Sequence, residues 1–312
     1  MGEEKPVRIP ESGSEDYQYR MFRALLKKEA SKFKLNDNSP AQFTPLKDYI
    51  DQARHILAHK GEVQGIATNY PSLDSKLQGI TSGELIVIGG STGTGKTMFA
   101  LNLIANAYIG SPQMFTTLIV TMEMTKPQVT ARLLEIIDSS EYAGSASAFP
   151  ILFYDHPVAE PTIKDIRTLV MKMKQEIGCQ VVLIDHLHCF ARSLESQANE
   201  LGVIVRDLKK IAIDLEVAIV LVSHIRKSAP GQSHKEPTMD DLRGSSFIAQ
   251  DADVVIMLRR DREDPDLAHE LKVNVEKNRN KGETGSLSLA IDPKTHVLSD
   301  LETWMTPVAY HD

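Results

Sequence analysis

A glycine-rich segment in the first third of the chain has the residue types and the spacing needed to bind a nucleoside triphosphate. Residues 90–97, GSTGTGKT, fit the pattern G-x-x-x-x-G-K-[ST] and follow an apolar run. In such a loop, glycines let backbone N–H groups surround the phosphates, the lysine balances the β- and γ-phosphate charge, and the last hydroxyl binds Mg²⁺. We therefore expect ATP or another NTP with Mg²⁺ as cofactors, contacted by Gly90, Ser91, Thr92, Gly93, Thr94, Gly95, Lys96, Thr97 and Met98.

Three further side chains stand at the ends of apolar runs. Asp185 ends VVLID, Glu123 follows TLIVTM, and His224 ends AIVLVSH. In open parallel sheets, ligands collect at the carboxyl ends of the strands. Asp185 is therefore a candidate, with Thr97, to hold Mg²⁺, Glu123 to polarise the attacking water, and His224 to contact the γ-phosphate. The sequence also allows a helix cap at Asp185, a solvated loop position for Glu123 and a core or capping role for His224.

Apolar runs and helical patterns alternate from residue 73 onward. We predict buried strands at 85–90, 117–122, 151–155, 181–185, 218–224 and 253–260, and helices at 96–106, 126–137, 163–177 and 200–213. This alternation predicts an α/β fold with a mostly parallel central sheet that is covered on both faces. The segments 271–278 and 286–292 alternate apolar and polar residues, which predicts a C-terminal β-hairpin or edge strands.

The first sixty residues predict an extension to this domain. Residues 1–15 are polar and acidic and are expected to be disordered, and 35–43 read as a linker. Helical spacing from 16 to 34, and the pair Thr44-Pro45 before a second helical stretch, predict two short helices. We divide the chain into 1–15, a helical extension with a linker helix at 16–60, and a nucleotide-binding domain at 61–312. The extension is too short for a core of its own, so it packs on its own domain or on a neighbouring subunit.

Composition excludes several classes of protein. Subtracting 42 acids from 35 bases gives a net charge of −7, which argues against a uniformly basic nucleic-acid binder but not against a local basic channel. Two cysteines make no disulfide framework, and no apolar run could span a bilayer, so we expect a cytoplasmic protein without a membrane partner. The group Cys179, His186, His188 and Cys189 lacks the pair spacings typical of zinc sites, so we do not predict zinc there.

Motifs in the C-terminal half distinguish this sequence from other proteins with a phosphate loop. They are DLRGSS at 241–246, continuing as FIAQDADVVIMLRRD, and KNRNKGETG at 277–285, joined by TMEMT at 121–125 and DHLH at 185–188. Together with the phosphate loop, they resemble the DnaB-type replicative helicases over about residues 60–300. The likeness is greatest to the helicase half of phage and mitochondrial primase–helicases. The resemblance implies a RecA-like phosphate-loop NTPase core.

The resemblance also implies roles for individual residues. Glu123 matches the catalytic glutamate, Asp185 the metal-associated acid and His224 the γ-phosphate sensor. Arg279, with Lys277 beside it, matches the finger that reaches the neighbouring subunit's NTP, where a guanidinium stabilises charge on the transferring phosphoryl group. A further position, Arg260, matches one that packs against the nucleotide base. Solvated strand-end charges remain the alternative for Arg260 and Lys277.

Nucleic-acid contacts in this family come from loops that face a central channel. Residues 226–235 carry three bases and no acid, a composition suited to following a phosphate backbone without reading sequence. The alternative is a solvated loop without a ligand. The expected DNA-binding residues are Arg226, Lys227, Ser228, His234, Lys235 and Arg243, and the less charged loop 192–199 is a second candidate.

The resulting hypothesis is a replicative-type DNA helicase that uses NTP hydrolysis to move along single-stranded DNA and unwind duplexes as a ring homo-oligomer, expected to be a hexamer. Further expected partners are a primase or a helicase loader, in the cytoplasm of a bacterial or phage-infected cell rather than in the mitochondrial matrix. Two alternatives stay open: a RecA- or KaiC-like assembly ATPase without unwinding activity, and a non-enzymatic DNA-binding module. Ile291 and Asp292 stand where relatives often carry an aromatic over the base, which leaves base selectivity open.

Overall fold

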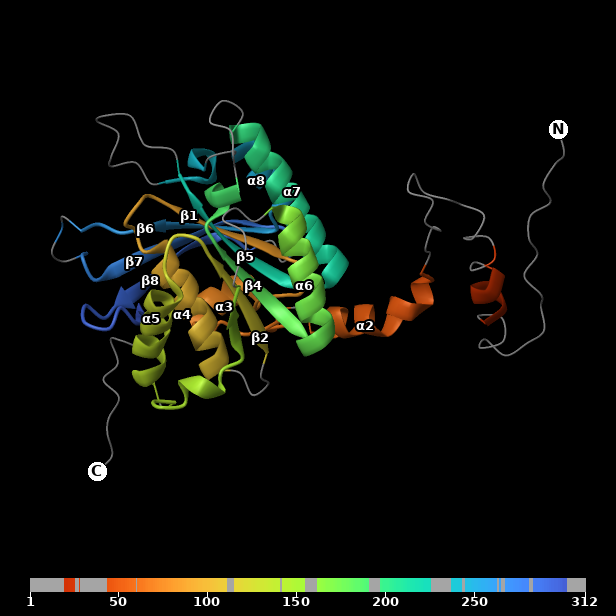
Figure 1. Ribbon diagram of the computed structural model, residues 1–312, viewed down its shortest axis with the longest axis horizontal. Helices are drawn as coiled ribbons and strands as arrows, with labels where there is room; N and C mark the ends of the chain where they lie inside the picture. The colour runs from red at the N-terminus through yellow and green to blue at the C-terminus, as the bar shows by residue number, and fades with distance from the viewer. Residues whose placement is uncertain are drawn as a thin grey trace. The chain divides into compact units, whose positions relative to one another are not determined.

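The fold is described from a computed structural model of the chain (Figure 1). It describes residues 20–25, 28, 44–59, 61–110, 115–140, 142–154, 162–190, 197–225, 237–242, 245–262, 264, 267–280 and 283–301. The chain divides into two units, residues 1–60 and 61–312, and each is described by itself. The predicted disorder at 1–15 and the predicted linker at 35–43 lie outside the described residues.

Most of the described residues of the first unit are helical. Residues 20–25 are helical, and a 3₁₀ turn, η1 (Leu46–Tyr49), leads into the helix α2 (Ile50–Ala58). Pro45 precedes the 3₁₀ turn, so the regular α-helix begins later than the pair Thr44-Pro45 suggested, because a 3₁₀ turn commonly opens a helix. Leu46 and Leu57 are among the most exposed large apolar side chains, and α2 buries none of its residues.

The described strands of the second unit form one sheet in the order β3-β2-β4-β5-β1-β6-β7-β8-β9. The strands from β3 to β6 in this order run parallel, and β7, β8 and β9 run antiparallel. The predicted mostly parallel sheet and the C-terminal hairpin, β7–β8, are therefore confirmed. The strands are β1 (Leu85–Gly90), β2 (Thr116–Thr121), β3 (Ile151–Phe153), β4 (Cys179–Asp185), β5 (Ala218–His224), β6 (Val254–Arg259), β7 (Glu270–Asn278), β8 (Gly285–Ile291) and β9 (Leu298–Asp300).

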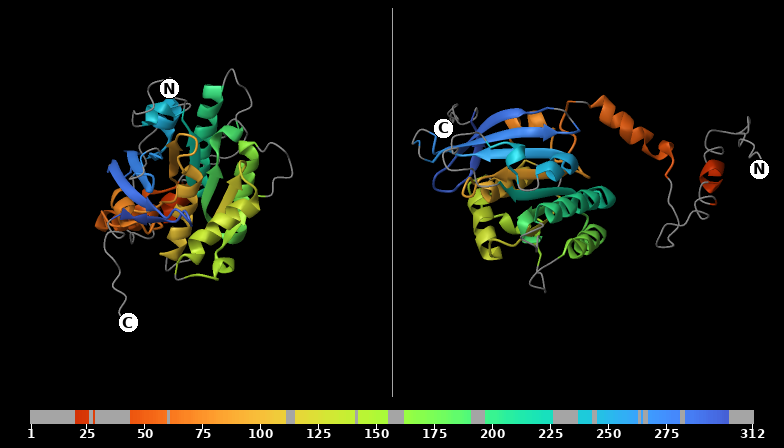
Figure 2. Two further views of the ribbon diagram at one scale, coloured as in Figure 1. Left: turned by 90° about the vertical axis from the view of Figure 1, so that its left-hand side faces the viewer. Right: turned by 90° about the horizontal axis from the view of Figure 1, so that it is seen from above.

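Helices cover both faces of this sheet (Figures 1 and 2). One face packs against α3 (Pro71–Leu77), α4 (Lys96–Ile109) and α5 (Lys126–Asp138), and the other against α6 (Ile163–Ile177), α7 (Gln197–Leu215) and α8 (Ser245–Asp251). Along β1, Ile86 and Ile88 belong to the first core and Leu85 and Val87 to the second. Because alternate side chains of a strand point to opposite faces, a continuous apolar run is what two covered faces require.

The central helix α4 holds the phosphate loop in place. It is apolar on nearly every side and buries most of its residues, as a helix enclosed by protein must. It begins immediately after Gly95, so its N-terminus opens directly onto the loop. The long helix α6 is bounded by local signals instead: a capping box between Thr162 and Asp165 at its start and left-handed Gly178 at its end.

Three short elements were not predicted from the sequence. These are α3, α8 and β9, the first two of seven residues and the last of three. Such segments are too short to show a clear hydrophobic period, so tertiary packing determines them. The predicted strand at 151–155 is also shorter, since β3 ends at Phe153. Among the described residues, no helix combines the length and the apolar character that crossing a membrane would require.

Candidate nucleotide-binding and hydrolysis site

A cleft of about 670 Å³ opens at the carboxyl ends of the parallel strands. It brings together the phosphate loop and side chains from β2, β5 and the end of β6, which is where open α/β sheets bind ligands. The predicted site residues that line it are Thr92, Gly93, Gly95, Lys96, Thr97, Met98, Glu123, His224 and Arg260. The sequence therefore located the cleft, although it did not identify Arg132, Arg262 or His296, which also line it.

The phosphate loop has the backbone that its glycines allow. Gly93 and Gly95 lie in the left-handed region, at φ of +80° and +105°, which other residues rarely adopt. The buried Lys96 ammonium donates hydrogen bonds to the carbonyl oxygens of Gly90 at 2.9 Å and Ser91 at 2.7 Å. Burial lowers the pKa of Lys96, while the negative charges of Asp185 and Glu123 oppose that change. Lys96 is thus held inside the loop by carbonyl oxygens that phosphate oxygens could replace.

Thr97 and Asp185 fit the requirements of a magnesium site. The Thr97 hydroxyl donates to Asp185 Oδ2 at 2.8 Å, although the two residues are 88 positions apart in the sequence. The other carboxylate oxygen, Oδ1, is buried and has no hydrogen-bond partner in the described part of the chain. Burial raises the pKa of Asp185, and the hydrogen bond from Thr97 opposes this. A cation would favour the ionised carboxylate, and hard oxygen ligands are what Mg²⁺ prefers.

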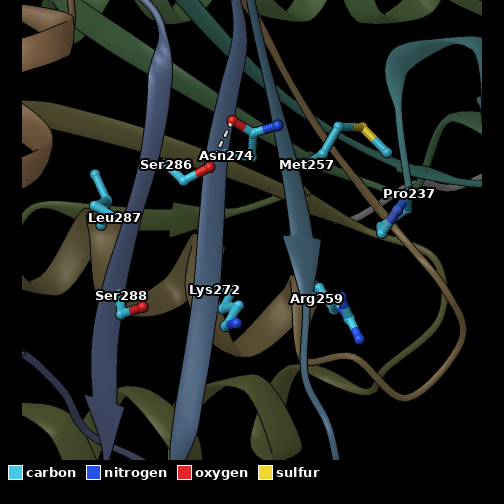
Figure 3. Close-up of a pocket in the computed structure, with 8 residues that line it drawn as sticks. All are labelled: Pro237, Met257, Arg259, Lys272, Asn274, Ser286, Leu287 and Ser288. Carbon is cyan, nitrogen blue, oxygen red and sulfur yellow. Dashed lines mark hydrogen bonds between the residues drawn. The ribbon is translucent and has the colours of Figure 1, made fainter. Parts of the chain in front are cut away.

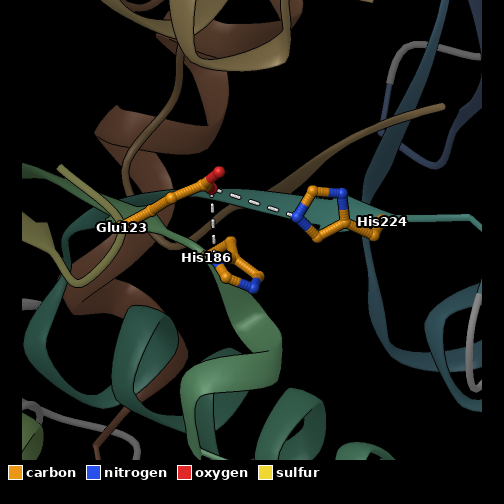
Figure 4. A group of neighbouring side chains, drawn as sticks. All are labelled: Glu123, His186 and His224. Carbon is orange, nitrogen blue, oxygen red and sulfur yellow. Dashed lines mark ion pairs between the residues drawn. The ribbon is translucent and has the colours of Figure 1, made fainter. Parts of the chain in front are cut away.

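Glu123 lies between two histidines from neighbouring strands (Figure 4). Its Oε2 atom is 3.5 Å from His186 Nδ1 and 4.0 Å from His224 Nε2, and the imidazole rings pack edge to face with centroids 4.6 Å apart. Half of the Glu123 side chain stays exposed to the cleft. The strand register places His224 beside Gly90, the first residue of the phosphate loop. His186 was not predicted here, although its position directly after Asp185 was the available signal.

The outer end of the cleft is built from the turn regions after β6 and β8. The Arg260 guanidinium donates from Nε and Nη2 to the Ala268 carbonyl at 3.0 and 2.8 Å, which fixes its orientation. His296, at φ of +58°, also lines the cleft, and its carbonyl accepts a hydrogen bond from Asn102 of α4. Ile291 is buried. The ring that the turn after β8 contributes to the cleft is therefore the imidazole of His296, not a side chain at position 291 or 292.

Arg279 and Lys277 lie at the opposite end of the sheet. The Arg279 N–H donates to the Asp253 carbonyl at 2.8 Å, and the Lys277 ammonium donates to the Ala252 carbonyl at 2.6 Å. The Asp253 carboxylate also accepts a hydrogen bond from the N–H of Leu85, the first residue of β1. The phosphate loop lies at the other end of this strand, at Gly90. The length of β1, about 17 Å at the rise of a strand, thus separates Arg279 from its own phosphate loop.

Comparison with known proteins identifies the family. The model of the DnaB-like helicase C-terminal domain matches residues 65–141 and 135–300. The chain belongs to this family. The replicative DNA helicase DnaB of Geobacillus stearothermophilus is 29% identical over 289 residues, and the replicative DNA helicase DnaC of Bacillus subtilis is 28% identical. Each alignment covers 83% of this chain and 63% of the relative, so the chain spans less than two thirds of their length.

Solved structures agree with the fold of a DnaB-like ATPase domain. The ATPase domain of G40P superposes with a TM-score of 0.73 at 24% identity, covering 84% of this chain and 100% of that one. A DnaB-like replicative helicase, described with its interactions with primase, superposes with a TM-score of 0.71 at 21% identity over 92% and 77% of the chains. The predicted RecA-like core and the DnaB-type resemblance are confirmed. Family and phosphate loop together make this cleft the candidate nucleotide site.

The expected DNA-binding residues of this DnaB-like domain lie outside the described residues, and so does most of the second candidate loop. This applies to Arg226, Lys227, Ser228, His234, Lys235 and Arg243. The described flanks of the 226–235 segment are informative, because Ile225 and Leu242 form an isolated antiparallel bridge. Leu242 also reaches β1: a Cβ placed on Gly89 would lie 2.6 Å from its side chain. The described residues Ile225 and Leu242 thus lie beside the strand that carries the phosphate loop.

A second, smaller cleft of about 240 Å³ lies on the antiparallel part of the sheet (Figure 3). Its lining includes Arg259, Lys272 and Met257. Polar side chains here pair with one another, as Ser286 does with Asn274 at 3.1 Å. Its lining contains no carboxylate and no histidine, unlike that of the larger cleft.

Proposed function

We propose that this chain is the motor domain of a replicative-type DNA helicase, which uses Mg²⁺-dependent NTP hydrolysis to move along single-stranded DNA and separate duplexes. The observation that carries the proposal is the grouping of Lys96, Thr97 and Glu123 in one cleft, with Asp185 hydrogen-bonded to Thr97. The bacterial relatives are replicative DNA helicases by name, which favours this function over an assembly ATPase.

Each residue of the cleft would contribute a defined chemical effect. The Glu123 carboxylate would orient the attacking water and accept its proton as the new P–O bond forms. Lys96 and the N–H groups at the start of α4 would stabilise the negative charge that develops on the transferring phosphoryl group. Thr97 and Asp185 would hold Mg²⁺, which supplies charge neutralisation between the β- and γ-phosphates. His224 would contact the γ-phosphate and respond to its loss.

The position of Arg279 supports a ring in which subunits share sites. It cannot reach its own phosphate loop across the length of β1, yet its side chain is 45% exposed. A surface arginine that completes the neighbour's cleft requires head-to-tail contacts, and these close into a ring when the rotation allows. We therefore propose a homo-oligomer, expected to be a hexamer, with Arg279 and Lys277 contributed in trans.

Coupling to DNA would run through the residue beside the phosphate loop. His224 pairs in register with Gly90, the basic segment 226–235 follows soon after it in the sequence, and Ile225 between them forms a bridge with Leu242. A change at the γ-phosphate would thus reach the segment through a single residue. We propose that this segment contacts the strand's phosphates, with 192–199 as the second loop.

The remaining assignments follow from the relatives. We propose that residues 16–60 form an extension whose α2 packs on an adjacent subunit, because its apolar residues Leu46 and Leu57 lack cover in their own unit. A related structure is described with its interactions with primase, so a primase or a helicase loader is the proposed protein partner. A bacterial or phage-infected cytoplasm is the proposed location.

A forked-duplex assay tests this function. With NTP and Mg²⁺, the chain should release the labelled strand, and Lys96→Ala should not. Phosphate release should rise when single-stranded DNA is added. Hydrolysis without strand separation would instead support the assembly ATPase, and absence of both in a chain that binds DNA would support the non-enzymatic module.

A further inference from the structure

The three side chains around Glu123 make a set that suits a softer metal than magnesium. Glu123 Oε2, His186 Nδ1 and His224 Nε2 come from the ends of the adjacent strands β2, β4 and β5, and these atoms all lie within 4.8 Å of one another. Two imidazole nitrogens and a carboxylate are ligands that Zn²⁺ accepts readily, whereas Mg²⁺ prefers oxygen. This group is therefore distinct in chemistry from the Thr97–Asp185 pair.

A fourth candidate donor, a thiol, lies beside His186. The Sγ atom of Cys189, on the 3₁₀ turn η3 (Leu187–Phe190), is 3.5 Å from His186 Nδ1. Thus His186 Nδ1 is 3.5 Å both from this sulfur and from the Glu123 carboxylate. Metal–ligand bonds of 2.0–2.3 Å in a tetrahedron place the ligand atoms about 3.3–3.8 Å apart. Those two separations match this range, and the 4.0 Å between Glu123 and His224 needs only a small side-chain rotation. The Cys189 sulfur is outside the group of three whose ligand atoms all lie within 4.8 Å of one another, so its side chain must rotate toward the ion to complete the site.

We propose that Glu123, His186, His224 and Cys189 bind Zn²⁺ in the nucleotide-free protein, and that this ion inhibits hydrolysis. The inhibitory part rests on the proposed function, in which Glu123 orients water and His224 contacts the γ-phosphate. An ion bound to both Glu123 and His224 prevents the first from orienting water and the second from contacting the γ-phosphate. The site differs from the group considered from sequence, because Cys179 lies at the opposite end of β4 and is buried there.

A cobalt titration of the nucleotide-free, tag-free full chain tests the binding directly. His55 and His59, one turn apart on α2 with rings stacked at 4.2 Å, could capture metal themselves, so the titration uses the His55→Ala/His59→Ala background. We expect one equivalent of tetrahedral Co²⁺ with a thiolate-to-cobalt absorption band. His186→Ala should weaken binding by about tenfold or more, since even outer-shell changes have effects of that size.

Two cysteine variants make the assignment specific. Cys189→Ser should lose the thiolate band, and Cys179→Ser should keep it. Circular dichroism and the thermal unfolding midpoint show whether each variant is folded. If His186→Ala does not fold, the comparison of the two cysteine variants still tests the metal site. Absence of stoichiometric Co²⁺ binding, or a thiolate band that survives in Cys189→Ser, overturns the site.

The inhibition is measured by phosphate release at constant Mg²⁺, with free Zn²⁺ set by a chelator buffer. Cys189→Ser should hydrolyse NTP normally without zinc and need about tenfold more free Zn²⁺ for half-inhibition, whereas Cys179→Ser should respond like the unmodified chain. Equal sensitivity of Cys189→Ser and the unmodified chain overturns the inhibitory role. A chain that hydrolyses no NTP refutes the proposed function, while the cobalt titration still decides the metal site.

Discussion

The two ends of the parallel sheet hold their charged side chains in different ways. At the carboxyl ends, Lys96 and Glu123 line an open cleft, and the lysine rests on loop carbonyls that a nucleotide can replace. At the amino ends, Asp253 is 2% exposed and its carboxylate contacts Lys209 at 2.6 Å, the Leu85 N–H at 2.8 Å and Arg279 at 3.5 Å. Lys96 can therefore exchange its hydrogen-bond partners, whereas the contacts of Asp253 hold the Arg279 side chain in a fixed orientation.

This difference suits the role proposed for Arg279 at an interface between subunits. One side of the Arg279 guanidinium is anchored by Asp253 and by the Gln250 carbonyl, and its backbone N–H is bonded to the Asp253 carbonyl. The side chain is nevertheless 45% exposed. An arginine fixed in advance loses less entropy when it meets a phosphate, so the anchoring favours its use in trans.

The largest expected effect is that of Arg279→Ala. Loss of an arginine finger lowers turnover by about a thousandfold or more, so DNA-stimulated phosphate release should nearly vanish while nucleotide binding stays within about twofold. Mixing this variant with Lys96→Ala chains should restore part of the hydrolysis, because the Lys96→Ala subunits supply their intact Arg279 to their neighbours. No recovery on mixing would contradict the assignment in trans.

The next effect concerns stability at the amino ends of the strands. Asp253→Ala should lower the free energy of unfolding of the full chain by about 3 kcal/mol, because it leaves the Lys209 ammonium buried without its carboxylate. Urea denaturation measures this. The double variant with Lys209→Met should lose less than the sum of the two single changes. Additive losses would show that the pair is not coupled.

At the open end, Glu123→Gln should lower single-turnover hydrolysis by about a hundredfold, since the amide cannot accept the proton of the attacking water. Binding of a fluorescent nucleotide should be nearly unchanged. Glu135→Gln is the matched control, because Glu135 lines the same cleft from α5. An equal loss in both variants would point to general electrostatics instead of a specific role for Glu123.

The smallest effect is expected at the outer rim of the cleft. His296→Ala should raise the KM for NTP by about fivefold with little change in kcat, the size of one lost aromatic contact of roughly 1 kcal/mol. Thr295→Ala, at the neighbouring position, serves as the control in steady-state assays. A change in kcat without a change in KM would show that His296 does not contact the base of the bound nucleotide.

Sequence reasoning succeeded where pattern and local physics agree. The phosphate loop, the apolar strands and Asp185 after its strand each carry a signal within a few residues, and the fold follows from their alternation. Arg262 and His296 carry no such signal, because only the packing of distant segments brings them to the cleft. For the same reason α3 and β9, which gain stability from tertiary contacts, were not predicted.

The close approach of Gly89 and Leu242 has a mechanical consequence. A Cβ at Gly89 would lie 2.6 Å from the side chain of Leu242, the residue that forms a bridge with Ile225, so β1 and Leu242 are in direct contact. Because protein interiors transmit displacement where no void can absorb it, a shift of one must be felt by the other. If residues 90–97 bind the nucleotide and residues 226–235 contact DNA as proposed, a displacement at one site would be transmitted through β1 and Leu242 toward the other.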